Sequence, residues 1–197
     1  RQASRALARA DTATKNTALT DIAEQIRKNA ALLQQENARD LQAGKDKGLD
    51  AALLDRLELT DARIESMAEG IEQVAVLADP IGEISDMTYR PSGIQLGQMR
   101  VPLGVIGIIY ESRPNVTIDA ACLCLRSGNI SILRGGSECI ETNKKLYECI
   151  QDALKDLNFD THLVCFIQNT DRSFVEELLK AEGHIDVIIP RGGKSLI

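Results

Sequence analysis

The chain has 197 residues, a net charge of −6, and 44% hydrophobic but only 3% aromatic residues, with no tryptophan. This length allows one large domain or two small ones with a sizeable core. The acidic balance and the few aromatic rings argue against nucleic acid or an anionic membrane as a partner, because both need a basic surface. No apolar run approaches the ~20 residues that span a bilayer.

The cysteine and histidine content bears on redox compartment and metal binding. Five cysteines, an odd number at irregular spacings, suggest reduced thiols in a cytoplasmic protein. With only His162 and His184 in the chain, we expect no metal site. Cys139 is expected to be more exposed than the other thiols. Four thiols are expected to be buried and structural: Cys122, Cys124, Cys149 and Cys165.

The first 80 residues are predicted to be helical. Apolar residues recur at helical spacing over 19–33, behind a capping candidate at Asp11. A second helical pattern over 64–78 starts behind Thr60 and stops at Pro80. Two short extended runs, 83–89 and 94–101, then flank the turn signal Pro91-Ser92-Gly93 and predict a β-hairpin. An isolated hairpin is marginally stable, so we expect it to pack against another part of the protein or another subunit.

From residue 103 onward, strands and helices alternate. The near-continuous apolar run 103–110 is rich in Ile and Val, which suits a strand buried on both faces. Further strands are predicted over 130–133, 163–167 and 185–189, and helices over 116–126, along 146–157 and behind a cap at Asp171. This order predicts an α/β fold with a parallel sheet and right-handed crossovers.

Ligands of such sheets bind at the edge formed by the carboxyl ends of the strands. Three predicted strands run there into polar loops that carry Arg113, Arg134 and Arg191. Two of these arginines stand beside paired glycines, which let backbone N–H groups approach a ligand, and arginine binds phosphate in a bidentate manner. We therefore predict an anionic, phosphate-bearing ligand, although any one of these loops, taken alone, is equally consistent with a solvated turn.

Two familiar nucleotide motifs are missing. No G-x-G-x-x-G follows a predicted strand, since Gly104 and Gly107 lie inside the first one. Gly193-Lys194-Ser195 suggests a P-loop, but Ile188 stands where that motif requires its first glycine. A P-loop kinase is thus a distant alternative.

Asn115 has two interpretations. The spacing favours a cap for the helix that starts at Val116, and the alternative is that its amide donates to an oxyanion. Glu111 and Asp119 are interpreted as a loop charge and a helix-face charge.

Residues 101–119, VPLGVIGIIYESRPNVTID, closely resemble the gamma-glutamyl phosphate reductase family of the aldehyde dehydrogenase superfamily. Segments 125–129, 132–136 and 185–193 support the resemblance. It implies a parallel Rossmann-like sheet of the aldehyde dehydrogenase type. Residues 1–81 would form the helical part of a cofactor-binding domain, 82–101 an oligomerisation hairpin, and 102–197 the nucleotide-binding core.

The resemblance also implies an activity, namely NADPH-dependent reduction of L-glutamyl 5-phosphate to L-glutamate 5-semialdehyde with release of phosphate, in proline biosynthesis. In this family a cysteine thiolate displaces phosphate, and hydride then resolves the thioester. That cysteine lies in a later catalytic domain, and none of the five here matches it. We therefore expect these 197 residues alone to be inactive, and the protein to form a homo-oligomer through the hairpin.

By the same resemblance, Asn115 matches an oxyanion-hole asparagine, and Arg134 stands where dehydrogenases carry a lysine that contacts the adenosine ribose. Ser137 replaces a glutamate typical of NAD-preferring enzymes, which leaves room for the 2′-phosphate of NADPH. Arg113 is hypothesised to bind the phosphate or carboxylate of the substrate. The residues expected to contact the cofactor are Arg134, Gly135, Gly136, Ser137, Arg191, Gly192 and Gly193.

Two other functions stay open at this point. One is an enzyme of the same fold that oxidises a free aldehyde, which Arg113 and the Arg-Gly-Gly loops disfavour. The other is a non-catalytic nucleotide-binding or assembly module, which the missing nucleophile would favour if the natural chain ended at Ile197.

Overall fold

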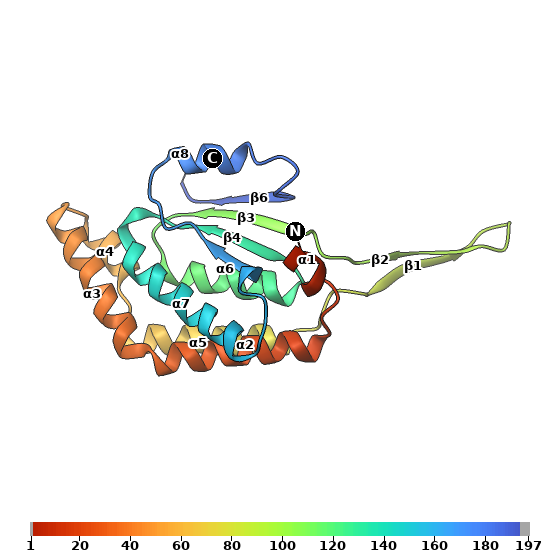
Figure 1. Ribbon diagram of the computed structural model, residues 1–197, viewed down its shortest axis with the longest axis horizontal. Helices are drawn as coiled ribbons and strands as arrows, with labels where there is room; N and C mark the ends of the chain where they lie inside the picture. The colour runs from red at the N-terminus through yellow and green to blue at the C-terminus, as the bar shows by residue number, and fades with distance from the viewer. Residues whose placement is uncertain (1, 194–197) are drawn as a thin grey trace.

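A computed structural model describes residues 2–193 (Figure 1). The N-terminal helices are α1 (Gln2–Leu7), α2 (Thr12–Lys28), α3 (Ala30–Asp46), α4 (Ala51–Leu57) and α5 (Asp61–Val76). The hairpin strands are β1 (Ile84–Tyr89) and β2 (Gln95–Met99). The remaining elements are β3 (Val105–Tyr110), α6 (Pro114–Arg126), β4 (Ile130–Arg134), α7 (Ile140–Asp156), β5 (Val164–Phe166), α8 (Ser173–Leu179) and β6 (Val187–Arg191). The predicted α/β class, with N-terminal helices and a hairpin, is confirmed.

The main sheet has four parallel strands in the order β5-β4-β3-β6. All six residues of β3 are buried, as its apolar run predicts. The chain moves outward from β3 through β4 to β5 and then returns to the other side of β3 as β6. The strand order therefore reverses at β3, and such a reversal is where open α/β sheets bind their ligands.

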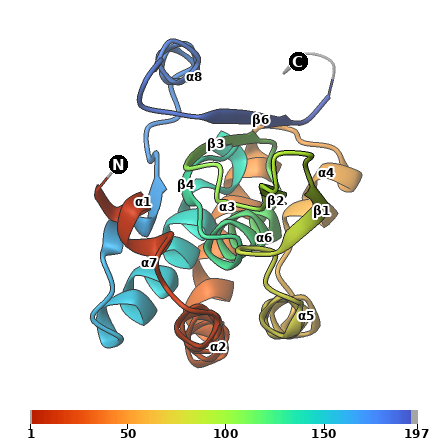
Figure 2. The ribbon, with the colours of Figure 1, turned by 90° about the vertical axis from the view of Figure 1, so that its right-hand side faces the viewer.

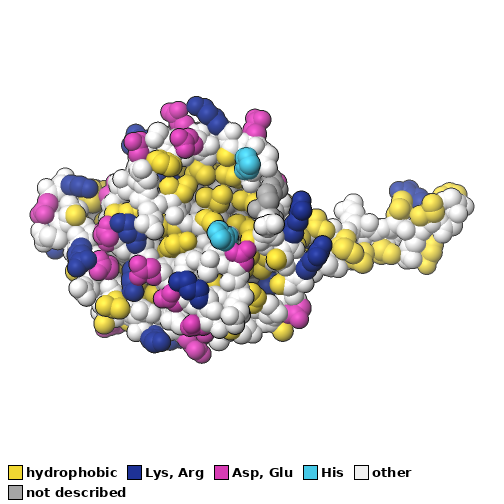
Figure 3. All heavy atoms as spheres, in the orientation of Figure 1, with side chains coloured by type: hydrophobic (Ala, Val, Ile, Leu, Met, Phe, Trp, Pro, Cys, Tyr) yellow, Lys and Arg dark blue, Asp and Glu magenta, His cyan; other side chains and the backbone are white. Residues whose placement is uncertain are grey.

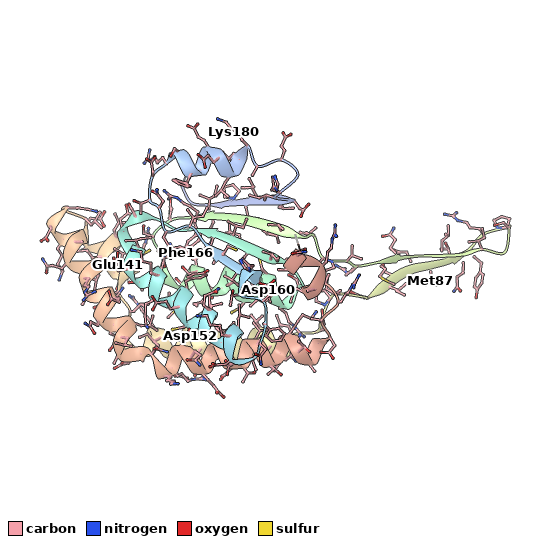
Figure 4. All side chains as sticks on the ribbon, in the orientation of Figure 1. Met87, Glu141, Asp152, Asp160, Phe166 and Lys180 are labelled. Atoms are coloured by element: carbon pink, nitrogen blue, oxygen red, sulfur yellow. The ribbon has the colours of Figure 1, made fainter. Side chains whose placement is uncertain are left out.

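Helices cover the two faces of the sheet unequally. Figures 1 and 2 show α6 and α7 directly beneath the sheet, α2 and α5 as a further layer below them, and α8 alone on the opposite face. Figure 4 labels Phe166 on the lower side, where its ring centroid lies 5.9 Å from that of Tyr147 in α7. The core contains fully buried side chains from several layers, including Leu19, Ile22, Ile118, Leu133, Leu146 and Ile150.

Local capping explains two helix starts. Asp11 Oδ1 accepts a hydrogen bond from the Thr14 backbone N–H at 2.7 Å, at the start of α2. Thr60 Oγ1 accepts one from the Arg63 N–H at 3.2 Å, at the start of α5. Both predicted caps are confirmed, and they satisfy N–H groups that have no partner within the helix.

Several boundaries differ from the prediction, and three of these differences have a local cause. The single helix expected over 19–33 is broken at Asn29, whose side-chain Nδ2 donates to the Gln25 carbonyl at 2.8 Å. Apolar residues continue on both sides of this break, so their spacing did not reveal it. Helix α8 has Arg172 as its cap residue, although the Asp171 carboxylate does accept from the Ser173 N–H at 2.9 Å. Strand β6 starts two residues late, because the Ile185 N–H donates to the Ala181 carbonyl instead.

The predicted hairpin is present and extends away from the body of the molecule (Figure 1). Its strands pair in antiparallel fashion, from Ile84 opposite Met99 to Tyr89 opposite Gln95. Every residue of both strands is exposed. The register shifts between Ser85 and Thr88, around a positive φ of 54° at Asp86.

Candidate cofactor and substrate site

The loops that follow β4, β3 and β6 meet at one edge of the sheet. Arg134 pairs in register with Ile109, and Arg191 pairs with Tyr110, so the three carboxyl ends are level. The two loops joined to β3 and β6 also contact each other directly. The Glu111 N–H donates to the Arg191 carbonyl at 3.2 Å, and the Gly193 N–H donates to Glu111 Oε1 at 2.5 Å. Glu111, interpreted as a plain loop charge, thus connects two parts of the predicted site.

Arg134 is the last residue of β4, and its side chain is only 9% exposed. Its guanidinium donates to the carbonyls of Gly135 at 3.0 Å and Thr170 at 2.8 Å, while its buried Nε has no hydrogen-bond partner. Within residues 2–193, no carboxylate forms an ion pair with it. A fixed arginine without a counter-charge suits an anionic ligand.

A cavity of about 360 Å³ lies between this sheet edge and α8. Its polar lining includes the cations Arg134 and Arg172, the hydroxyl of Ser137, and the carboxylates of Glu111, Glu138 and Glu176. Val175 of α8 adds an apolar wall. Ser137 is exposed, and its hydroxyl donates to Glu138 Oε1 at 3.2 Å. The cavity therefore brings three predicted cofactor residues, Arg134, Gly136 and Ser137, together with Arg172, which the sequence did not single out.

Gly135 and Gly136 are fixed by packing. A Cβ at Gly135 would lie 2.6 Å from Asn143 Nδ2, and one at Gly136 would lie 2.9 Å from the Ser112 backbone nitrogen. The two glycines were expected to let a ligand approach the backbone. The structure shows that they also let the loop after β3 and helix α7 approach this turn.

Asn115 does not cap α6, so that interpretation is wrong. The cap residue is Arg113, and Pro114 occupies the first helical position, where its missing N–H costs nothing and its fixed φ fits the helix. Asn115 is exposed, and its Nδ2 donates to Asp119 Oδ2 at 3.2 Å. Since an amide nitrogen carries two hydrogens, one is left for another acceptor. Its oxyanion role stays a prediction.

Desolvation raises the pKa of Asp119 above its usual value, although the hydrogen bond from Asn115 and the charge of Arg191 oppose that shift.

Arg113 is half-buried and lines a second cavity, of about 300 Å³, with Arg56 and Glu138. Of the residues that the structure describes, none forms an ion pair with Arg113.

Glu138 is the acidic group nearest to Ser137 in sequence. Burial would raise its pKa, but hydrogen bonds from Ser112 and Ser137 and the charge of Lys47 hold that pKa below its usual value. The carboxylate is therefore ionised and engaged with two hydroxyl groups.

The thiols are poorly activated. Burial raises the pKa of Cys124 and of Cys139 to about 12 and that of Cys149 to about 11. Cys122 is also buried, Cys165 is half-buried, and the pKa of each thiol is raised mainly by burial. The expectation that Cys139 is exposed is wrong, because it is fully buried beneath the Gly136 turn and accepts from Asn143 Nδ2 at 3.2 Å. None of the five resembles a reactive thiolate.

Some features of the site came only from the fold. Arg56 and Arg63 of the N-terminal helices line the same cavity as Asn115, although they are 59 and 52 residues away in sequence, and no local pattern linked them. Lys194 and Ser195, which raised the P-loop alternative, lie outside the described residues. Over residues 2–193, no cluster of three or more His, Cys, Asp or Glu side chains is placed to hold a metal ion. Within the same range, no helix has the length and apolar character to cross a membrane.

The sheet, the hairpin and the N-terminal helices together define a fold of the aldehyde dehydrogenase type. A probable aldehyde dehydrogenase from Listeria monocytogenes EGD-e matches all of this chain, and 40% of its own length, with a TM-score of 0.76 at 14% identity. That level of identity shows the fold alone. No model of a known protein family matches the chain.

Two solved structures are much more similar. Gamma-glutamyl phosphate reductase from Thermotoga maritima is 41% identical with a TM-score of 0.96, and the match covers 100% of this chain and 47% of that one. The Saccharomyces cerevisiae reductase is 30% identical with a TM-score of 0.92, covering 99% and 50%. The predicted resemblance to gamma-glutamyl phosphate reductases is confirmed, and the chain spans about half the length of these two proteins.

Proposed function

We propose that this chain supplies the cofactor site of an NADPH-dependent reductase that converts L-glutamyl 5-phosphate to L-glutamate 5-semialdehyde, releasing phosphate, in cytoplasmic proline biosynthesis. The observation that carries the proposal is the buried guanidinium of Arg134, at a cavity that Ser137 also lines. Its charge has no ion-pair partner among residues 2–193, and its Nε has no hydrogen-bond partner. The likeness to two gamma-glutamyl phosphate reductases supports the substrate.

The residues present fit NADPH. Arg134 and Arg172 offer positive charge, and the buried Nε of Arg134 lacks a partner. Of the three carboxylates in the same lining, Glu111 accepts from the Gly193 N–H and Glu138 accepts from two hydroxyl groups, while Glu176 belongs to α8. The small side chain of Ser137 leaves room for a 2′-phosphate, and Glu138 is turned onto Ser112 and Ser137. The paired glycines at 192–193 lie at the adjoining loop, where the pyrophosphate would bind. When bound, NADPH would supply the hydride.

Two further roles are proposed for residues at the start of α6. Arg113, at the cap position, would contact the phosphate of the substrate, and Asn115 would donate its second amide hydrogen to the carbonyl oxygen as it gains negative charge. The nucleophilic thiolate would come from none of the five cysteines described above. We therefore propose that these 197 residues bind ligands but do not turn over alone, and that the protein assembles as a homo-oligomer through the hairpin.

The test is a titration of the chain with NADPH and with NADH. We expect tighter binding of NADPH, and we expect Ser137→Glu to weaken NADPH about 10-fold or more because its carboxylate would face the 2′-phosphate. NADH affinity should not fall. In the same assay, Arg113→Ala should weaken the binding of inorganic phosphate and leave the affinity for NADPH unchanged.

Ser92→Glu is the matched control, since it makes the same change in the exposed hairpin turn. The cofactor assignment is wrong if the wild type binds NADH as tightly as NADPH, or if Ser137→Glu and Ser92→Glu behave alike.

A non-catalytic nucleotide-binding module is the second candidate, and the buried, high-pKa thiols favour it. It would bind the cofactor with no response to phosphate, so Arg113→Ala would change nothing.

A further inference from the structure

A cavity of about 390 Å³ opens beside Asn115 and is separate from the cofactor cavity. Its lining combines charges of both signs with an apolar floor. The charged members are Arg56, Glu58, Arg63 and Asp119, and the floor includes Leu59 and Met67. Because the lining comes from α4, α5 and α6, the packing of the N-terminal helices on the sheet creates this cavity.

The charges in the cavity are not all free. Arg63 donates to the Glu58 carbonyl at 3.0 Å and to Asp55 Oδ1 at 2.9 Å, so its guanidinium is already engaged. Arg56, in contrast, forms no ion pair with any residue in the described range. Asp119 receives the amide of Asn115 on Oδ2, and no described residue donates to its Oδ1. The guanidinium of Arg56, one oxygen of Asp119 and the carboxylate of Glu58 are thus available to a ligand that bears both charges.

The spacing along α6 fits an amino acid. Asp119 lies one helical turn beyond Asn115 on the same face of α6, and Asn115 Nδ2 is 3.2 Å from Asp119 Oδ2. In an extended glutamyl group, four bonds separate the reacting carbonyl carbon from the α-nitrogen, a distance of about 5 Å. A substrate whose carbonyl oxygen accepts from Asn115 therefore has its α-ammonium within reach of Asp119, and Leu59 and Met67 of the same lining would face its methylene groups.

We propose that Asp119 binds the α-ammonium of the substrate and Arg56 its α-carboxylate, so that this cavity selects an α-amino acid over the corresponding simple diacid. The inference rests on the proposed function, because that function places the carbonyl at Asn115. A charge-assisted hydrogen bond from an ammonium to a carboxylate is among the stronger polar contacts, and it is lost entirely when the amino group is absent.

L-glutamate and glutarate make the test, because they share both carboxylates and differ in the α-ammonium. In calorimetric titrations of the 197-residue chain, we expect L-glutamate to bind about 10-fold tighter than glutarate. Asp119→Asn should reduce that ratio to about 1, by weakening L-glutamate alone. Arg56→Gln should weaken both compounds and preserve the ratio. Glu69→Gln, which neutralises an exposed carboxylate on α5 outside the cavity lining, should match the wild type.

NADPH binding by the same variants separates the two proposals. If NADPH binds but Asp119→Asn keeps the preference for L-glutamate, or neither compound binds the wild type, the amino-acid subsite is wrong and the cofactor assignment stands. If NADPH fails to bind the wild type as well, the proposed function falls with it. A ratio that collapses in Asp119→Asn with NADPH affinity intact supports both.

Discussion

The hairpin and the four-stranded sheet are both β-structure, yet they bury their residues in opposite ways. All positions of β1 and β2 are exposed, whereas all positions of β3 are buried. The sheet is held by apolar burial between helices, while the hairpin has only its backbone hydrogen bonds and cross-strand pairs. The same amino-acid change should therefore have very different effects in the two regions.

The hairpin nevertheless carries many apolar side chains. Tyr89 is 78% exposed and Val101 is 67% exposed, and Figure 3 shows hydrophobic surface along the whole arm. Met87 is labelled in Figure 4 on this arm, away from the body. Apolar side chains gathered on an exposed surface mark interaction sites in many proteins. This surface supports the proposal that the hairpin pairs with another copy of the chain.

The largest expected effect separates Leu133 in β4 from Leu96 in β2. Leu133→Ala empties a fully buried site and should lower the free energy of unfolding by about 2–5 kcal/mol. Leu96 is 46% exposed, so Leu96→Ala should lower the free energy of unfolding by no more than about 0.5 kcal/mol. Urea denaturation of both variants measures the difference.

Light scattering on the same samples adds the assembly state. If Leu96→Ala destabilises the chain as much as Leu133→Ala, while the molar mass is that of one chain, the hairpin must be part of the cooperative core. That outcome would contradict the comparison.

Two glycine substitutions, one in each region, form a matched pair with an expected difference in stability of intermediate size. A methyl group at Gly136 would press against the Ser112 backbone, which cannot rotate away, so Gly136→Ala should cost about 1–3 kcal/mol and disturb NADPH binding. At Gly97 the nearest atom is the sulfur of Met87, the far end of an exposed, flexible side chain. Gly97→Ala should therefore be nearly neutral in thermal unfolding. If Gly136→Ala proved as nearly neutral in thermal unfolding as Gly97→Ala, the turn after β4 would have to adapt to a side chain, and the prediction would be wrong.

Short-range signals made most of the fold predictable. The apolar run of β3 and the caps at Asp11 and Thr60 depend only on neighbouring residues, and the structure has all three. The break at Asn29 was not predicted, because a single side-chain amide bonding to a carbonyl four residues back leaves no trace in the apolar spacing. The position of β6 beside β3 was not predicted either, since strand order depends on packing between distant segments.

The site likewise has features that follow from local sequence and features that depend on packing between distant segments. Arg134 could be placed at the sheet edge from its position after a strand, but its bond to the Thr170 carbonyl depends on how the α8 loop folds back. Cys139 was misjudged because its burial depends on Asn143 and on the turn above it. Arg56 and Asp119 line the same cavity only after the helices have packed, so no sequence pattern predicts that they share a site.

The smallest predicted effect concerns two ion pairs. Lys15 and Asp79 are 2.5 Å apart with side chains 3% and 11% exposed, whereas Glu83 and Arg100, at the base of the hairpin, are 2.9 Å apart and mostly exposed. Burial would raise the pKa of Asp79, but hydrogen bonds from Lys15, the Ile81 N–H and Thr12 hold it below its usual value.

Because the pKa of Asp79 is lowered by folding, its contribution to stability is present above the pKa of the unfolded chain, near 3.8, and is lost as the pH falls through the folded value. Between about pH 5 and pH 2, the wild type should lose on the order of 1 kcal/mol that Asp79→Asn does not lose. Glu83→Gln should follow the wild-type curve, since exposed pairs contribute little and are screened by salt. Denaturation curves at several pH values decide the matter. If Glu83→Gln were instead the variant that removes the acid loss, the hairpin base would be electrostatically coupled to the core, and the separation between the two regions would fail.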